Sequence, residues 1–215
     1  MTKDATQEHS LDSLLFSSVD MPYHYKQQPR EADEQEYQSN QNTYAIVNGA
    51  GSDKVLMNLV AYEPEHRILF GDDDDAEALE EAAPWLVKLT RGEAYTEWLL
   101  DECFGQRLLL FMQSPEGIDG LAEHFKHYTK IEFPDKDNPE NFQTGFFSFY
   151  DPSIFPAWAK SLNQEEATQF FQPISNIWYE ENKQLKLFYL KTKGWQQIGF
   201  DLEAKENQEQ AGVQA

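Results

Sequence analysis

The sequence predicts an α/β fold with a mixed, largely parallel central sheet flanked by helices and antiparallel hairpin strands in the C-terminal third. Three observations support this prediction. Apolar runs alternate with segments of helical periodicity through most of the chain, as in α/β layers. The central runs are continuously apolar, which is typical of parallel strands buried on both faces. The last third contains closely spaced β-rich segments separated by short turns, which favours hairpins.

The first elements follow a polar segment. TYAIVNG (43–49) is an apolar run that ends at Asn-Gly, so it predicts a buried strand. Ser52 is predicted to be the N-cap of a following helix. That helix has one apolar face, formed by Val55, Leu56, Leu59 and Val60. Short apolar runs around Ile68 and over 85–89 predict the next two strands.

The middle of the chain continues the alternation. EAYTEWLLDECFG (93–105) predicts a helix that ends at Gly105, which suits a left-handed C-terminal cap. Residues 108–112 are the strongest predicted strand. Ser114 and Pro115 then predict the N-cap and first turn of another helix. Its buried face is expected to comprise Ile118, Leu121, Ala122, Phe125 and Tyr128.

The C-terminal third has a different pattern. FFSFY (146–150) is predicted to be a strand, and NQEEATQFF (163–171) a helix. Asn163, with Glu166 three residues later, matches a capping box at the start of that helix. The segments NIWYEE, QLKLFYLK and WQQIGF are predicted to form short antiparallel strands linked as hairpins.

Tyr150, Asp151 and Pro152 lie between the predicted strand 146–150 and the helix expected after it. An aspartate at the N-cap accepts hydrogen bonds from unpaired amides, and a proline in the first helical position has no donor to leave unpaired. We therefore interpret this motif as a structural joint. The alternative is that Tyr150 or Asp151 contacts a ligand or partner.

Composition shifts divide the chain into three parts. Residues 1–42 form a polar N-terminal arm, expected to be partly flexible, in which Leu11, Leu14, Leu15 and Phe16 allow one short docked helical turn. Residues 43–200 form the folded domain, with a core part over about 43–150 and a C-terminal subdomain over about 151–200. Residues 201–215 are expected to be a flexible tail.

Charge and cysteine content narrow the functional classes. The chain has 17 basic and 38 acidic residues, for a net charge of −21, which disfavours binding to nucleic acid or anionic membranes. The single cysteine, Cys103, permits no intrachain disulfide and fits a reducing compartment. We expect it to be a packed core thiol. No signal peptide or membrane span is apparent, so the expected location is cytoplasmic.

No segment shows a convincing catalytic, cofactor or metal site. NGAGSDK (48–54) lacks the third glycine of a dinucleotide motif and the ending of a phosphate loop. His124 and His127 lack further ligands for zinc and are expected to face solvent. Asp72 to Asp75 lack the spacing of a calcium loop. We therefore predict no enzyme activity, no cofactor and no metal. A competing hypothesis is an enzyme that uses Asp151 and Tyr150 with a metal on His124.

Aromatic residues are abundant, with 15 Phe, 10 Tyr and 5 Trp, and aromatic side chains left at a surface often anchor protein interfaces. Trp158, Trp178 and Tyr179 lie in segments that look peripheral, so we predict them to bind a partner. A basic stripe without acidic residues is predicted to orient an acidic partner; it comprises Lys183, Lys186, Lys191 and Lys193.

Several landmarks occur in an order that resembles a known family. They are TYAIVNGA, ILFG, APWLVKL, EWLLDECFGQRLLLFMQSP, LAEHFKHY, FSFYDPSIF and QFFQPI, over about residues 43–180. Together they resemble the effector-adaptor chaperones of bacterial type VI secretion. The family commonly has arginine where this chain has Ser148 and Ser153, so contacts made by those arginines do not carry over.

The resemblance implies that residues 43–200 are an adaptor domain. Proteins of this family are cytoplasmic, bind a cognate effector and help to load it onto the VgrG spike. The partners expected here are therefore an effector, through its N-terminal region, and VgrG. The alternative is an immunity protein that binds and neutralises a toxin, which suits the acidic composition.

Overall fold

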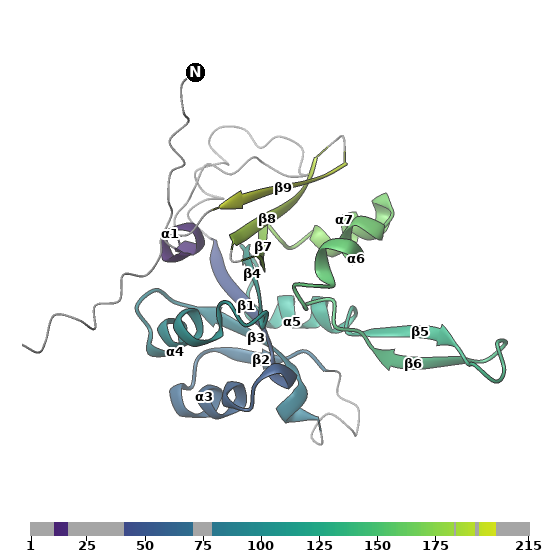
Figure 1. Cartoon of the computed structure of the whole chain (residues 1–215), viewed down its shortest axis with the longest axis horizontal. Helices are drawn as coiled ribbons and strands as arrows, with labels where there is room; N and C mark the ends of the chain where they lie inside the picture. Colours follow the sequence, from purple (N-terminus) through teal and green to yellow (C-terminus); the bar gives the residue numbers. More distant parts are fainter. Residues whose placement is uncertain (1–10, 17–40, 71–78, 183, 192–193, 201–215) are drawn as a thin grey trace, which may run out of the picture.

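A seven-stranded antiparallel sheet forms the centre of the molecule (Figure 1). The computed structural model describes residues 11–16, 41–70, 79–182, 184–191 and 194–200. Across the sheet the strands are β2 (His66–Ile68), β3 (Pro84–Leu89), β1 (Asn42–Asn48), β4 (Leu109–Ser114), β7 (Asn176–Glu181), β8 (Gln184–Lys191) and β9 (Gly194–Phe200). Every adjacent pair is antiparallel.

The prediction of a largely parallel sheet is therefore wrong. β1 and β2 do run in the same direction, but β3 lies between them and is antiparallel to both. In the same way, β1 lies between β3 and β4. The helical connections from β1 to β2 and from β3 to β4 thus join parallel strands that are not neighbours. The predicted C-terminal hairpins are confirmed by the consecutive pairing of β7, β8 and β9.

Helices cover both faces of the sheet and create two hydrophobic cores. One face packs against α1 (Leu11–Phe16), α3 (Lys54–Tyr62), α4 (Ala94–Trp98) and the π-helical turn η3 (Leu99–Cys103). The other packs against α5 (Ile118–Lys126), α6 (Phe155–Ser161) and α7 (Gln164–Phe171). Along β1, Ala45 and Val47 enter the first core, whereas Tyr44 and Ile46 enter the second. The apolar runs thus reflect burial on both faces.

Two short 3-10 turns complete the first face. η1 (Gly49–Gly51) follows β1, and η2 (Glu80–Ala82) precedes β3. The two turns are in contact, because the Gly49 amide donates to the Ala83 carbonyl at 3.0 Å. A β-carbon at Gly49 would lie 2.4 Å from that carbonyl oxygen, so only glycine permits this approach.

The short helix α1 docks on the first core. Leu14 and Leu15 are buried there. The Leu15 carbonyl accepts hydrogen bonds from Thr43 Oγ1 (2.9 Å) and Gln113 Nε2 (3.0 Å). This part of the N-terminal arm is therefore held by both packing and hydrogen bonds.

Helix starts were predicted with mixed success. The capping box of α7 is confirmed: Asn163 Oδ1 accepts from the Glu166 amide at 3.0 Å, and Glu166 Oε2 accepts from the Asn163 amide at 2.8 Å. The N-cap of α5 is Gly117 instead of Ser114, whose hydroxyl donates to the Pro173 carbonyl at 2.5 Å. The N-cap position of α3 is Asp53 instead of Ser52, but the Ser52 hydroxyl accepts from the Lys54 amide at 3.3 Å, whereas the Asp53 side chain makes no capping bond.

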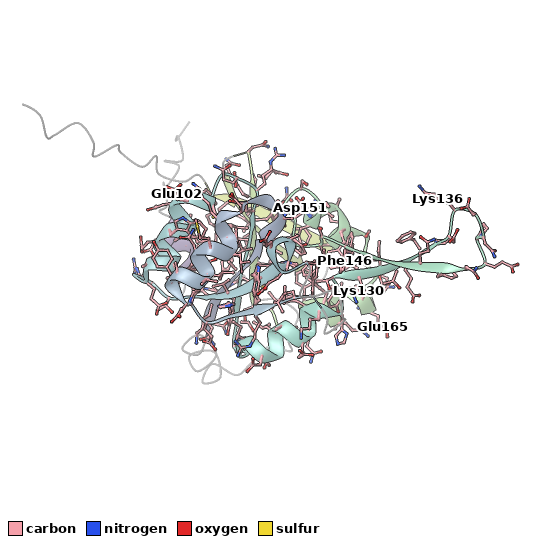
Figure 2. The ribbon with its side chains drawn as sticks, turned by 90° about the horizontal axis from the view of Figure 1, so that it is seen from below. Glu102, Lys130, Lys136, Phe146, Asp151 and Glu165 are labelled. Carbon is pink, nitrogen blue, oxygen red and sulfur yellow. The ribbon has the colours of Figure 1, made fainter. Side chains whose placement is uncertain are left out.

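A second, two-stranded sheet extends from the body as a hairpin (Figures 1 and 2). It consists of β5 (Lys130–Pro134) and β6 (Phe142–Phe146). The predicted strand over 146–150 is wrong, because β6 ends at Phe146 and residues 147–150 form no strand. Among the described residues, no helix is both long and apolar enough to cross a bilayer.

Candidate partner-binding surface

Tyr150, Asp151 and Pro152 lie in a turn in which Tyr150 and Pro152 are buried and Asp151 is half-buried, and α6 starts only at Phe155 with Ile154 as its N-cap. Asp151 Oδ1 accepts hydrogen bonds from the amide (2.7 Å) and hydroxyl (2.6 Å) of Ser153. Asp151 is therefore a turn residue before the helix and not its N-cap. Burial raises the pKa of Tyr150, so its hydroxyl is poorly suited to donate or accept a proton near neutral pH.

Two of the three predicted aromatic anchors are not at the surface. Trp178 and Tyr179 are buried on opposite faces of β7, one in each core. The prediction that they are exposed is wrong, because β7 lies between β4 and β8 and helices cover both its faces. Trp158 is partly buried, and its ring contacts Phe170 edge-on at 4.9 Å between centroids. The aromatic excess thus mainly fills the second core.

Of the four lysines in the predicted basic stripe, the structure describes the side chain of one, Lys186. Lys186 is partly buried on β8, and its Nζ donates to Gln184 Oε1 at 2.5 Å. Lys183 and Lys193 lie outside the described residues, and for Lys191 only the backbone is described, in β8 opposite Gly194. The role of the stripe in binding stays a prediction.

His124 is half-buried against the second core, so the prediction that it faces solvent is wrong. Its Nε2 is 2.9 Å from the Phe170 carbonyl, and its ring packs beside Phe125 and Tyr128 at 5.1 and 5.3 Å between centroids. Burial lowers the pKa of His124, so the neutral ring that donates to this carbonyl is favoured. His127 is exposed.

The described residues contain no group of three or more His, Cys, Asp or Glu side chains arranged to hold a metal ion. The segment from Asp72 to Asp75 lies outside those residues. Cys103 is a buried thiol, as predicted, and burial raises its pKa to about 11. A thiol with so high a pKa is a poor nucleophile, since the thiolate is the reactive form.

The hairpin carries half of the exposed large apolar side chains in the described part of the chain. Four of its large apolar side chains are 39–64% exposed, and we call them the hairpin patch: Ile131, Phe133, Phe142 and Phe146. Figure 2 shows Lys130 and Phe146 near the base of the hairpin and Lys136 toward its tip. Exposed apolar side chains on a projecting ribbon are typical of a surface that binds another protein.

Contacts at its base hold the hairpin against the body. The ring of Phe146 packs against Phe70 with 4.5 Å between centroids. The Phe147 amide donates to the Thr129 carbonyl at 2.8 Å, and Thr129 Oγ1 donates to the Leu69 carbonyl at 3.2 Å. Because isolated two-stranded hairpins are at best marginally stable in water, these contacts are needed to preform the ribbon.

The tip of the hairpin is organised by one carboxylate. Asp135 accepts hydrogen bonds from the amides of Asp137 (2.7 Å) and Asn138 (3.2 Å) and from the side chain of Gln143. These bonds stabilise the charged form and lower the pKa of Asp135. The tip is therefore an ordered turn.

Sequence reasoning missed the hairpin, although a signal was present. KIEFP and FQTGF flank DKDNPEN, a cluster of turn-forming residues (Asp, Asn and Pro). Each flanking segment is only five residues long and mixes polar with apolar side chains, which makes the pattern weak.

A second apolar surface lies on the outer side of α3. Met57, Val60 and Tyr62 are exposed, whereas Val55 and Leu59 face the core. The prediction that Val60 shares the buried face is therefore wrong. We call these three exposed residues the α3 stripe. Exposed acidic side chains lie at both ends of α3 and on the adjacent η2, namely Asp53, Glu63, Glu80 and Glu81.

Comparison with known proteins identifies one family. A family model described as "Domain of unknown function (DUF4123)" matches residues 43–169, a range that includes both the hairpin and the α3 stripe. No curated protein and no solved structure matches the chain. Because the family model covers more than half of the 215 residues, the chain belongs to the DUF4123 family.

Proposed function

We propose that this protein is a non-catalytic adaptor that binds a cognate type VI secretion effector in the cytoplasm and helps to load it onto the VgrG spike. The family match over residues 43–169 covers most of the landmarks that resemble such adaptors, over about 43–180. The observation that carries the proposal is the hairpin patch.

The hairpin patch supports binding of a polypeptide in preference to a small molecule. It is displayed on a projecting ribbon with its base fixed to the body, so a partner can contact it from more than one side. Aromatic side chains such as Phe133 and Phe142 supply large contact area at low entropic cost. Shielding an apolar effector segment until transfer is the action that we propose for this patch.

The remaining polar groups are consistent with an adaptor role. Tyr150 and Asp151 belong to a turn before α6, and the half-buried His124 is hydrogen-bonded beside the aromatic side chains of the second core. Each candidate group of the competing enzyme hypothesis thus has a structural partner. We expect the effector to engage through its N-terminal region.

Coexpression with the full-length product of the neighbouring large gene tests the proposal. We expect one stoichiometric peak on size-exclusion chromatography. Phe142→Ser should weaken the complex at least about tenfold, because it removes a large apolar contact. Met57→Ser is the matched control: Met57 is 61% exposed, close to the 64% of Phe142, and lies on α3 away from the hairpin.

Two clean, separate peaks for the parent proteins would overturn the adaptor role. A complex that Phe142→Ser leaves unchanged would remove the hairpin patch as its site. A gene deletion separates the adaptor from an immunity protein: loss of an adaptor abolishes effector delivery and leaves self-protection intact, whereas loss of an immunity protein makes the cell sensitive to its own toxin.

A further inference from the structure

We infer that the free edge of β6, Phe142–Phe146, binds an extended segment of the effector as a third strand of the hairpin sheet. This inference rests on the proposed function, because the added strand belongs to the effector. It specifies how binding occurs: backbone pairing along one edge, with the hairpin patch flanking it.

The register shows which backbone groups point away from the ribbon. The Asp135 amide donates to the Asn141 carbonyl, and the Phe147 amide donates to the Thr129 carbonyl, each at 2.8 Å. In an antiparallel pair, hydrogen-bonded and non-hydrogen-bonded residue pairs alternate. The residues that direct their amide and carbonyl groups outward are therefore Lys130, Glu132 and Pro134 on β5, and Phe142, Thr144 and Phe146 on β6.

The two outer edges differ in their ability to accept a strand. On β5, Pro134 has no amide hydrogen to donate, and Lys130 and Glu132 are charged. Proline and charged residues are devices that protect an edge from pairing. On β6, all three outward-facing residues have an amide hydrogen and none is charged. Backbone pairing is thus blocked along β5 and available along β6.

The outward-facing groups of β6 have no other partner in the described part of the chain. The two-stranded sheet ends at β6, and no backbone hydrogen bond outside the β5–β6 ladder involves Phe142, Thr144 or Phe146. All three residues are exposed. Unpaired backbone groups in a row are the complement of another strand in extended conformation.

The side chains along this edge favour an apolar strand. Phe142, Thr144 and Phe146 point to the same face of the ribbon, because alternate residues of a strand share a face. An incoming strand with apolar residues at alternate positions would pack beside the two phenylalanines. β6 has five residues, so the added strand would pair over roughly 17 Å.

Charge identifies the partner further. Acidic residues outnumber basic ones on the hairpin: the acidic residues are Glu132, Asp135, Asp137 and Glu140, and the basic ones are Lys130 and Lys136. The whole chain has a net charge of −21, which opposes pairing of β6 with a second copy. The occupant is therefore an effector segment that alternates apolar residues and is flanked by lysine or arginine.

Matched proline substitutions test the edge. Thr144→Pro removes an outward amide on β6, and Glu132→Pro removes its direct cross-strand counterpart on β5. Neither amide is used within the ribbon, so both variants should keep the parent fold, which circular dichroism and the thermal midpoint check. With the full-length effector as probe, we expect Thr144→Pro to weaken binding at least tenfold and Glu132→Pro to change it less than about twofold.

Hydrogen exchange provides a second readout that needs no substitution. In the parent complex, the amides of Phe142, Thr144 and Phe146 should become at least tenfold more protected, while that of Glu132 should not. A parent complex with unaltered exchange at these three amides, or equal effects of the two proline variants, overturns the inference and leaves the adaptor role standing. If the parent proteins form no complex, both proposals are overturned.

Discussion

Asp151 shows how closely a single residue can be predicted from sequence. We expected its carboxylate to accept from free amides near a helix start, and it does so with Ser153, but the helix begins at Phe155. The chemistry of the side chain was predictable because Asp-Pro favours turns. The helix boundary was not, because a hydrogen-bonded turn and a first helical turn use the same residue types.

Asp151→Ala should destabilise the fold by about 1 kcal/mol, because the Ser153 amide and hydroxyl both lose their acceptor. Urea denaturation measures the free energy of unfolding. Asp151→Asn keeps an acceptor oxygen and should recover most of the stability. A catalytic role instead predicts that Asp151→Asn abolishes turnover. If Asp151→Ala were as stable as the parent, the turn assignment would be contradicted.

His124 should make stability depend on pH. Its pKa is lowered from the ordinary value of 6.5 in the folded chain, so protonation favours the unfolded state. The contribution of the neutral ring is complete above about pH 6.5 and is lost as the pH falls toward the lowered value. Urea denaturation at about pH 7.5 and 5.5 should show a smaller acid-induced loss of stability in His124→Gln than in the parent.

His127→Gln is the control for this measurement, because His127 is the exposed residue that caps the C-terminus of α5. Its charge is a smaller cause of the lowered pKa of His124 than burial is, so this variant should keep most of the pH dependence of the parent protein. Carboxylates contribute equally to all three proteins, so a larger effect of His124→Gln than of His127→Gln identifies the His124 ring as the source. Identical pH dependence in His124→Gln and the parent would show that the half-buried ring does not titrate in this range.

Strand direction is the feature that the sequence could not supply. The central runs of β1, β3 and β4 predicted strands correctly and are buried on both faces. Burial on both faces is common in parallel sheets, but it results here from helices on either side of an antiparallel sheet. The apolar pattern of a strand predicts which of its faces are buried. It does not predict which strand lies beside it, and the neighbouring strand decides whether the pair is parallel or antiparallel.

The sequence also did not predict which aromatic residues are buried and which lie exposed on the hairpin. Tyr179 looked peripheral by its position in the sequence, yet β8 and β9 extend the sheet beyond it. The exposed aromatics of the hairpin occur in segments too short and too polar to predict strands. The candidate surface was thus found only once the structure separated core aromatics from projecting ones.

Phe146→Ala should loosen the hairpin without unfolding the body. Phe146 packs on Phe70 at the base, and a two-stranded ribbon has little stability of its own. The ladder amides of Ile131 and Gly145 should exchange at least about tenfold faster, measured by hydrogen exchange with NMR detection. Phe142→Ala, near the tip, should leave these two amides close to parent rates. Equal acceleration in both variants would mean that Phe146 is not the anchor.

The net negative charge acts on the molecule as a whole. It lowers the stability of the free protein but raises its affinity for a basic partner segment. With a net charge of −21, the folded chain experiences self-repulsion that salt screens. The Debye length falls from about 30 Å at 0.01 M to about 8 Å at 0.15 M ionic strength. We therefore expect the thermal midpoint of the free protein to rise over this range in sodium chloride, with potassium chloride giving the same rise if screening is the cause.

The complex should respond to the same change with the opposite sign. An effector segment flanked by lysine or arginine is attracted to the acidic hairpin, and screening weakens that attraction. Isothermal titration calorimetry at both ionic strengths should show a lower affinity at 0.15 M, with the larger effect on the association rate in stopped-flow measurements. Purely apolar contacts between two acidic partners would instead give an affinity that rises with salt. That result would contradict a partner segment flanked by basic residues. It would not alter the expected effect of salt on the free protein.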